Sequence, residues 1–243
     1  MGALGRPTPP ARTVRWPGPL LAGLGLVAAV FGGAGAAAAG EAPPRQAAAA
    51  EAPAAIQEVR RWVLATGDNE GQPFVIVDKL DARVAAFDRA GAMIALAPIL
   101  LGLATGDDSP AGIGDRPLAD IGPLDRITPA GRFPAQLGEN LGGKTVLWVD
   151  YEAAISLHPV VTTLSSEHRL ARLDSPTTSD NRISYGCINV PVAFYSAVIL
   201  PLFQETPGLV YVLPETRSLE DEFFRRDRAA AAGPDRLAAM PPV

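Results

Sequence analysis

Residues 183–190, with the sequence ISYGCINV, contain the only cysteine in the chain, Cys187. A lone thiol in an exported protein has no intramolecular disulfide partner, so it is either a buried, unreactive side chain or a reactive one. Gly186 permits a tight turn beside the sulfur, and Pro191 stands where a helix is expected to begin. Unpaired N–H groups at such a helix start favour a thiolate. The stretch therefore predicts a nucleophile, with the N–H groups of Gly186 and Cys187 directed at an oxyanion.

The order of residue types along the chain predicts one domain with a leader and a tail. Residues 1–39 hold three arginines, then an apolar run and small residues, which is the order of a secretory signal; the alternative is an uncleaved N-terminal anchor. Residues 40–71 are predicted to form a linker and a short amphipathic helix, and residues 72–215 the folded domain. Residues 216–243 are predicted to form a short helix followed by disorder.

Composition argues against several classes of protein. The formal net charge is -5 and the chain has no run of basic residues, which argues against nucleic-acid binding. The chain has only two histidines, His158 and His168, and no cluster of cysteine and histidine, so no metal site of the zinc type is expected. No glycine-rich, phosphate-binding motif follows a strand-like run, so no nucleotide cofactor is expected.

Apolar runs separated by turn residues predict a sheet. The strand-like runs are residues 74–77, 84–87, 93–101, 144–149, 154–158 and 208–213. Because the first runs are joined by short turns, we expect hairpins and an antiparallel sheet. Residues 105–133 are dense in Gly, Asp and Pro, and we expect a long surface excursion there.

The sequence SYGCIN at residues 184–189 resembles the signature of the L,D-transpeptidase catalytic domain (YkuD type), whose usual form is Ser/Thr-His-Gly-Cys-x-Asn/Arg. Three other features agree in order: a hairpin pattern around residues 75–101, the turn TPAGRF at residues 128–133, and a strand-like run that ends at His158. Tyr185 departs from the family, which has histidine there. The resemblance spans residues 72–215. It implies a mainly β fold, an L,D-transpeptidase-like sandwich or barrel with a helix before the domain and a short helix after the cysteine.

The same resemblance implies a function. It implies a cysteine acyltransferase that acts on peptidoglycan stem peptides in the periplasm or envelope of a bacterium, through a thioester on Cys187. It implies no cofactor and no metal, and it marks carbapenem-type compounds as expected inhibitors. Two alternatives remain at this point: a non-catalytic envelope binding protein on the same fold, and a cysteine peptidase or carboxypeptidase of peptidoglycan.

Cysteine acyl chemistry needs a base or ion-pair partner, and the chain offers two histidines. His168 precedes Ser184 by about the interval that is usual in the family. His158 ends a strand-like run, as the family's histidine does, although Pro159 replaces the glycine that usually follows. We prefer His158, because an insertion in the loop after it costs little entropy, whereas His168 lies in a polar segment. His168 is the alternative base, and a third option is that neither acts.

Four further residues are candidates for the site. By resemblance, Ser184 orients the histidine and Asn189 holds the turn. Tyr185 either hydrogen-bonds the substrate or packs as an aromatic side chain. Arg182 either meets a carboxylate of the stem peptide or is a solvated charge.

Overall fold

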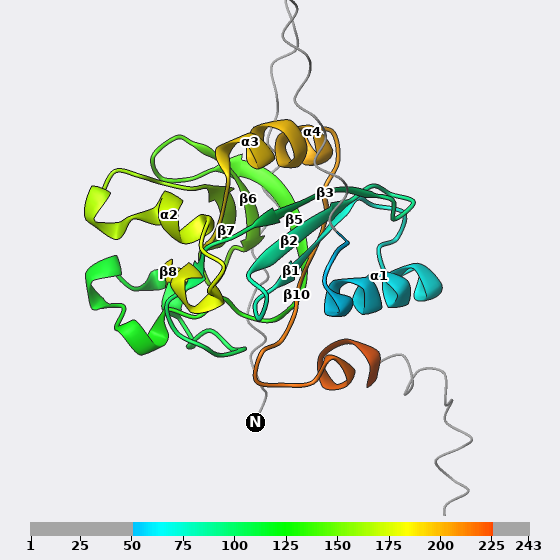
Figure 1. The fold of residues 1–243 in the computed structure, drawn as a ribbon, viewed down its shortest axis with the longest axis horizontal. Coiled ribbons are helices and arrows are strands. Elements are labelled where there is room, and N and C mark those ends of the chain that lie inside the picture. The colour runs from blue at the N-terminus through cyan, green and yellow to red at the C-terminus, as the bar shows by residue number, and fades with distance from the viewer. Residues whose placement is uncertain (1–50, 226–243) are drawn as a thin grey trace, which may run out of the picture. The chain divides into compact units, whose positions relative to one another are not determined.

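The computed structural model describes residues 51–225, so the predicted leader and the end of the tail lie outside the described residues. This part of the chain is mainly β, with ten strands and several short helices (Figure 1). Eight strands form one sheet in the order β3-β2-β1-β10-β5-β6-β7-β9, and β4 pairs with β8 in a second sheet of two strands. Among residues 51–225, no helix is long and apolar enough to cross a membrane.

Apolar and β-branched runs form most of the strands. The large sheet contains β1 (Phe74–Asp78), β2 (Arg83–Phe87), β3 (Met93–Pro98), β5 (Gly131–Glu139), β6 (Thr145–Asp150), β7 (Ile155–Pro159), β9 (Ile188–Val190) and β10 (Gly208–Val212). The small sheet contains β4 (Leu101–Gly102) and β8 (Arg182–Ser184). The pairs β1–β10 and β7–β9 are parallel, as is β4–β8. The hairpins expected for the first runs are confirmed, since β1–β2 and β2–β3 are antiparallel, whereas these three parallel pairs are joined through long connections.

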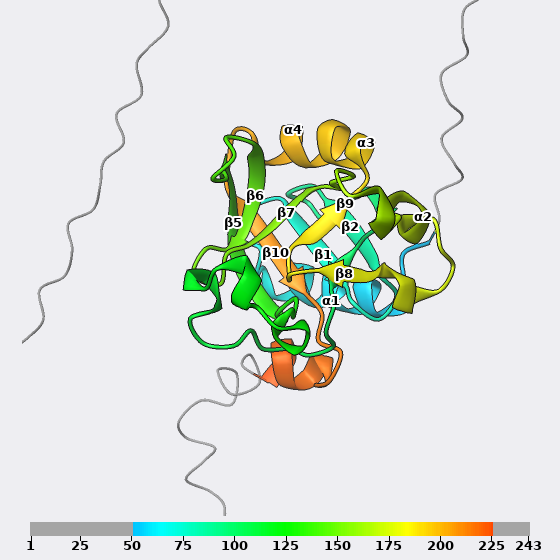
Figure 2. The same cartoon turned by 90° about the vertical axis from the view of Figure 1, so that its left-hand side faces the viewer.

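The two end strands of the large sheet meet next to the small sheet. Leu100, two residues after β3, donates its N–H to the carbonyl of Asn189 in β9 at 2.8 Å. The N–H of Asn189 donates to the carbonyl of Leu100 at 2.9 Å. The large sheet is thus nearly closed (Figure 2). This confirms the expectation of a mainly β fold of the sandwich or barrel type.

Helices cover both faces of the strands at the centre of the sheet. Their bounds are α1 (Ala54–Thr66), α2 (Arg169–Leu173), α3 (Val192–Phe194) and α4 (Leu200–Phe203), with a π-helical turn at Tyr195–Ile199 between α3 and α4. The helix expected before the domain is α1, which ends where Gly67 adopts a left-handed conformation with φ of 71°. The helix expected after the cysteine begins at Val192, with Pro191 as its N-cap.

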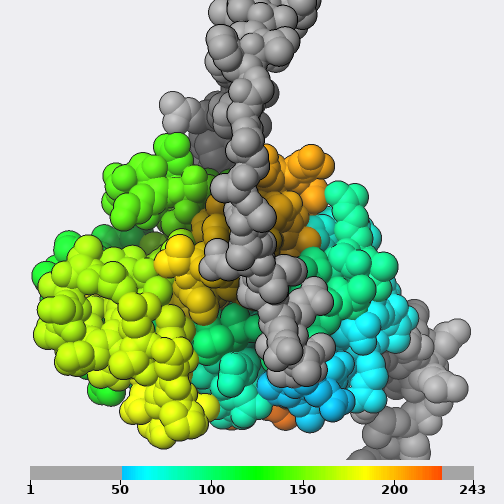
Figure 3. Space-filling model, turned by 45° about the horizontal axis from the view of Figure 1, so that its top comes forward, coloured from blue at the N-terminus to red at the C-terminus, as the bar shows by residue number. Residues whose placement is uncertain are grey.

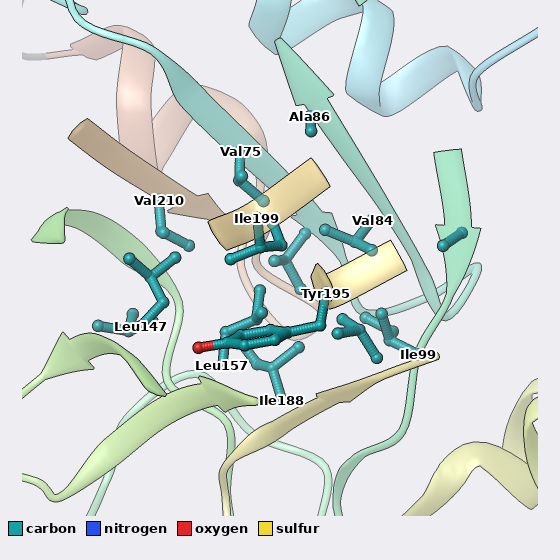
Figure 4. Close-up of a cluster of buried hydrophobic side chains, with 14 of the residues drawn as sticks. Val75, Val84, Ala86, Ile99, Leu147, Leu157, Ile188, Tyr195, Ile199 and Val210 are labelled. Carbon is teal, nitrogen blue, oxygen red and sulfur yellow. The ribbon is translucent and has the colours of Figure 1, made fainter. Parts of the chain in front are cut away.

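Alternation along β1 divides the apolar side chains between two cores. Val75 and Val77 face the core that α3 and α4 cover, which Figure 4 shows with Tyr195 and Ile199 among the strand side chains. Phe74 and Ile76 face the second core, which α1 covers. Because both faces of β1 are buried, its sequence reads as a continuous apolar run rather than an alternation.

Two expectations for the loops are wrong. The predicted excursion at residues 105–133 ends early, since β5 begins at Gly131, and it is not confined to the surface. Ile113, Ile121 and Thr128 are buried within it. The single run expected at residues 93–101 is broken after Pro98, and its two parts join different sheets.

The folded unit extends beyond the predicted bounds of 72–215. Phe223 lies in a π-helical turn at Glu220–Phe224 and is buried in the second core, where its ring centroid is 5.8 Å from that of Trp62 in α1. Both the helix before the domain and the first part of the predicted tail therefore pack on the sheet.

Candidate active site

Cys187 lies in a tight turn between β8 and β9. Gly186 has a φ of 127°, which side-chain-bearing residues rarely adopt. A Cβ atom there would lie 2.6 Å from Cδ1 of Ile155 and 2.7 Å from the carbonyl oxygen of Ile127. Glycine is therefore required beside the sulfur, both for the backbone conformation and for the close approach of another segment.

Two buried hydroxyl groups hold this turn. Ser184 Oγ donates to the carbonyl of Cys187 at 2.6 Å and accepts the Gly186 N–H at 3.1 Å. Thr128 Oγ1 donates to the carbonyl of Gly186 at 2.7 Å and accepts the Gly102 N–H at 2.9 Å. The resemblance assigned Ser184 to orienting the histidine, but its hydroxyl is used within the turn.

These bonds correct the expected oxyanion site. The N–H of Gly186 already donates to Ser184 Oγ, so it is not a free donor for a developing oxyanion. The predicted effect of a helix start is also wrong, because β9 separates Cys187 from α3 and a helix dipole acts only within its first turn. Ile188 and Val190, both fully buried, form a strand there instead of continuing into the helix.

His158 reaches the cysteine turn through strand pairing. It lies in β7, opposite Asn189 in the parallel register with β9. Its Nδ1 is 2.8 Å from the carbonyl oxygen of Pro159, and because a carbonyl only accepts, Nδ1 carries a proton. Nε2 therefore faces the cysteine side, where it also lies 3.3 Å from Nδ2 of Asn189.

Arg169 fixes the orientation of Asn189. Its guanidinium donates to Oδ1 of Asn189 at 2.6 Å, so the amide nitrogen of Asn189 faces His158 and the carbonyl of Cys187. An amide nitrogen does not accept a hydrogen bond. Nδ2 therefore donates to Nε2 when the imidazole is neutral, and when Nε2 carries a proton its acceptor is the sulfur of Cys187 rather than Asn189.

The sulfur and the imidazole favour their charged forms together. Burial raises the pKa of the Cys187 thiol, but the hydrogen bond and charge of His158, with the N–H and hydroxyl of Ser156, outweigh it and leave the pKa below its usual value. Burial lowers the pKa of His158, but the hydrogen bond and charge of Cys187 raise it above its usual value. The thiolate and the imidazolium thus each shift the other's pKa toward its charged form.

Ser156 is a site residue that the sequence argument did not assign. Its Oγ is 3.7 Å from the sulfur of Cys187, which also lies 3.6 Å from the carbonyl oxygen of Ala154. A signal was available, because alternation along the strand places Ser156 on the same face as His158. Arg169 had no comparable signal as a contact of the site, and Thr128 was noted only as the first residue of the TPAGRF turn.

His168 lies apart from this group. It is exposed at the start of α2, in the segment between β7 and β8 that forms the yellow-green lobe at the left of Figure 3. In the described part of the chain no hydrogen bond joins its imidazole to Cys187. Of the two histidines, the structure brings His158 to the sulfur.

Tyr185 and Arg182 differ in their surroundings. The Tyr185 ring is exposed, and the guanidinium carbon of Arg126 lies 3.8 Å from its centroid, so the two side chains stack. Arg182 is largely buried and pairs with Glu215, while it also donates to the carbonyl of Lys79 at 3.1 Å. Its charge is thus neutralised within the protein, in contrast to the expected contact with a substrate carboxylate.

Within residues 51–225, no three His, Cys, Asp or Glu side chains are arranged to hold a metal ion. No protein-family model matches the chain, and neither does any curated protein. The chain is similar in fold to L,D-transpeptidase domains.

Three solved structures illustrate the similarity. For the L,D-transpeptidase (residues 123–326) of Xylanimonas cellulosilytica DSM 15894, the identity is 13%, the coverage 58% of this chain and 60% of that one, and the TM-score 0.35. The helical cell shape determining protein Pgp2 of Campylobacter jejuni is 15% identical, with 65% of this chain and 56% of that one covered and a TM-score of 0.39. L,D-transpeptidase 1 of Mycobacterium tuberculosis is 14% identical, with 58% of this chain and 61% of that one covered and a TM-score of 0.30. The match thus spans about three fifths of each of these structures.

Proposed function

We propose that this chain is an L,D-transpeptidase-type cysteine acyltransferase that acts on peptidoglycan stem peptides in the bacterial envelope, to which the predicted leader would direct it. The observation that carries the proposal is the contact between Cys187 and His158, which lowers the pKa of the thiol and raises that of the imidazole. A thiolate beside an imidazolium is the form in which a cysteine attacks an amide carbonyl. The SYGCIN motif supports the same chemistry.

In the first half-reaction, the sulfur of Cys187 forms a bond to the amide carbonyl carbon of the donor peptide. The oxyanion that develops accepts a hydrogen bond from the N–H of Cys187. This N–H is the one that remains of the two oxyanion donors predicted at Gly186 and Cys187. His158 then gives its Nε2 proton to the departing amine, the terminal D-alanine. The C–N bond breaks, and the donor peptide remains as a thioester on Cys187.

In the second half-reaction, the neutral amine of an acceptor attacks the thioester. His158, now neutral at Nε2, takes a proton from the attacking nitrogen, and the thiolate of Cys187 leaves. The products are a new amide bond and the original thiolate–imidazolium pair. Water in place of the amine would release a shortened peptide, which is carboxypeptidase activity.

Covalent labelling with a carbapenem tests the nucleophile. We expect intact-mass spectra of the full chain to show one adduct on the wild type and none on Cys187→Ala, because the chain contains no other thiol. Circular dichroism of both proteins controls for folding. An adduct of equal yield on folded Cys187→Ala contradicts the proposal.

The product identifies the acceptor. Incubation with tetrapeptide muropeptides is expected to give cross-linked dimers, read by liquid chromatography and mass spectrometry. Tripeptides without dimers indicate a carboxypeptidase. If neither product forms and no carbapenem adduct is seen, the proposed acyl transfer is wrong.

A further inference from the structure

A largely buried guanidinium is linked to the proposed base through one amide side chain. Arg169 is the first residue of α2, in the segment between β7 and β8 (Figure 2). Its side chain is 12% exposed, and its Nη1 donates to Oδ1 of Asn189 at 2.6 Å. Asn189 is fully buried, so without this bond its Oδ1 would lose the charged donor that satisfies it. The bond therefore fixes which end of the amide faces His158.

The amide of Asn189 distinguishes the two charge states of the imidazole. Its Nδ2 lies 3.3 Å from Nε2 of His158, and a donor at this position stabilises Nε2 only when Nε2 has no proton. When Nε2 is protonated, two N–H groups face each other. Nδ1 keeps its proton in both states, because it donates to the carbonyl of Pro159 at 2.8 Å. Asn189 thus favours the neutral imidazole.

The charges around His158 act in opposite directions. Burial lowers the pKa of His158, the hydrogen bond and charge of Cys187 raise it, and the charge of Arg169 in α2 lowers it. Glu167, in the turn before α2, lies 2.7 Å from Nε of Arg169 and offsets part of the guanidinium charge. The sulfur therefore favours the imidazolium, whereas Arg169 favours the neutral ring.

Acylation removes only one of these opposing charges. A sulfur in a thioester carries no negative charge, so Cys187 then no longer favours a proton on Nε2. Burial, the amide of Asn189 and the charge of Arg169 are unchanged by the reaction, and all three favour the neutral ring. A neutral imidazole is the form that can accept a proton from an attacking amine.

We propose that Arg169, acting through Asn189 and by its own charge, is a positioning residue that keeps His158 neutral while Cys187 carries the acyl group. This inference rests on the proposed acyl transfer and concerns its second half-reaction. There the acceptor nitrogen forms a bond to the carbonyl carbon, and its proton passes to Nε2 of His158. The C–S bond breaks, and its electron pair stays on the sulfur. The restored thiolate then favours the imidazolium again.

Titration of His158 in the absence of the thiolate tests the proposal without any reaction. The full chain with Cys187→Ser and His168→Gln has one imidazole and no thiol, and it matches the charge of the acylated site. NMR of the imidazole gives the midpoint pH of His158. Arg169→Gln should move this midpoint to higher pH, because a nearby positive charge is lost. Glu167→Gln should move it to lower pH, because the guanidinium charge is then no longer offset.

Arg172 supplies the matched control. It lies in the same helix, but its guanidinium donates to the backbone carbonyls of Glu167 and Asp180 rather than to Asn189. Arg172→Gln should therefore leave the midpoint unchanged. Arg169→Lys keeps the charge and should give a lower midpoint than Arg169→Gln. Circular dichroism controls for folding, and Glu167→Gln decides the matter if Arg169→Gln does not fold.

Kinetics separate the two half-reactions. In a chain with Cys187 intact, carbapenem acylation reports the first step, and dimer formation from tetrapeptide muropeptides reports the second. Arg169→Gln should slow transfer from the thioester at pH 7 about two- to tenfold more than it slows acylation. Intact-mass spectra should therefore show more thioester on Arg169→Gln than on the wild type. The pH at which transfer reaches half of its maximum should rise.

The proposal is wrong if Arg169→Gln and Glu167→Gln move the midpoint in the same direction or not at all, or if Arg172→Gln moves it as far as Arg169→Gln does. The carbapenem adduct separates this failure from that of the proposed function. If the adduct forms on Cys187 and the midpoint does not move, only the role of Arg169 is wrong. If the midpoint moves as expected but neither adduct nor thioester forms, the acyl transfer is wrong, and the proposed role of Arg169 in it is wrong too.

Discussion

At the scale of single residues, the site depends on which imidazole can exchange a proton with the sulfur of Cys187. His158 donates through Nδ1 to the Pro159 carbonyl, which leaves Nε2 for Cys187. Asn189 presents its amide nitrogen and so does not compete for that proton. The hydrogen bonds around His158 therefore leave the sulfur of Cys187 as the acceptor for a proton on Nε2.

The two histidines form a matched pair for testing this. Because the His158 interaction lowers the thiol pKa, iodoacetamide should alkylate the wild type at a rate that stays high below the usual thiol pKa and falls only when the pH drops through the lowered value. His158→Ala should move that inflection to higher pH and slow carbapenem acylation about 10²–10⁴-fold. His168→Ala should match the wild type, and the reverse pattern would assign the base to His168.

At the scale of elements, a buried ion network ties the 105–130 segment to the cysteine turn. Lys79, the residue after β1, donates to Asp107 at 2.8 Å and to the carbonyl of Thr128 at 2.9 Å. Thr128 in turn donates to the carbonyl of Gly186. Asp107 also accepts the N–H groups of Glu215, Thr216 and Arg217. The segment that the sequence presents as a loop is thus fixed at both ends.

Asp107 and Asp108 are neighbours with different environments, which makes them a test of the network. Burial raises the pKa of Asp107, but its bonds to Lys79 and Thr216 and to backbone N–H groups lower it far more. Its contribution to stability is therefore present above a pH of about 4 and is lost only as the pH falls through its depressed folded value.

Asp107→Asn should lower the free energy of unfolding at pH 7 by about 3 kcal/mol, since it leaves the buried Lys79 ammonium with one carboxylate partner fewer. Asp108→Asn, at a side chain that is 79% exposed, should cost about 0–1 kcal/mol. Urea unfolding measures both. Equal losses would show that the network adds nothing beyond a surface ion pair.

At the scale of the whole molecule, the two ends of the described chain complete the second core. The parallel pairing of β1 with β10 places the last strand next to the first, and both are buried on both faces. Trp62 of α1 and Phe223 of the tail turn then pack together on the ring of Tyr211. Residues outside the predicted domain are therefore part of its packing.

Truncation of Phe223 measures this contribution. Phe223→Ala should lower the free energy of unfolding by about 3–5 kcal/mol, because the ring is 3% exposed and its loss leaves a cavity against Trp62. Phe224, the half-buried neighbour, is the comparison. Phe224→Ala should lower the free energy of unfolding clearly less than Phe223→Ala does. Urea unfolding is again the measurement, and a loss below 1 kcal/mol for Phe223→Ala would place the tail outside the cooperative unit.

The sequence by itself determined the local features of this protein. Six strand-forming runs, the start of the helix after Pro191, the glycine-dependent turn before Cys187 and the mainly β class follow from periodicity and turn chemistry within a few residues, whereas β5, β8 and β9 were not predicted. Even the position of Ser156 on the face of His158 was implicit in strand alternation.

Only the tertiary structure decided what depends on distant segments. The parallel pairing of β7 with β9 selects His158 over His168, and the bond from Gly186 to Ser184 removes a predicted oxyanion donor. The ion pair with Glu215 withdraws Arg182 from the substrate. Local patterns do not encode these contacts, because which strands pair, and in which register, is set by the burial of side chains far apart in the chain.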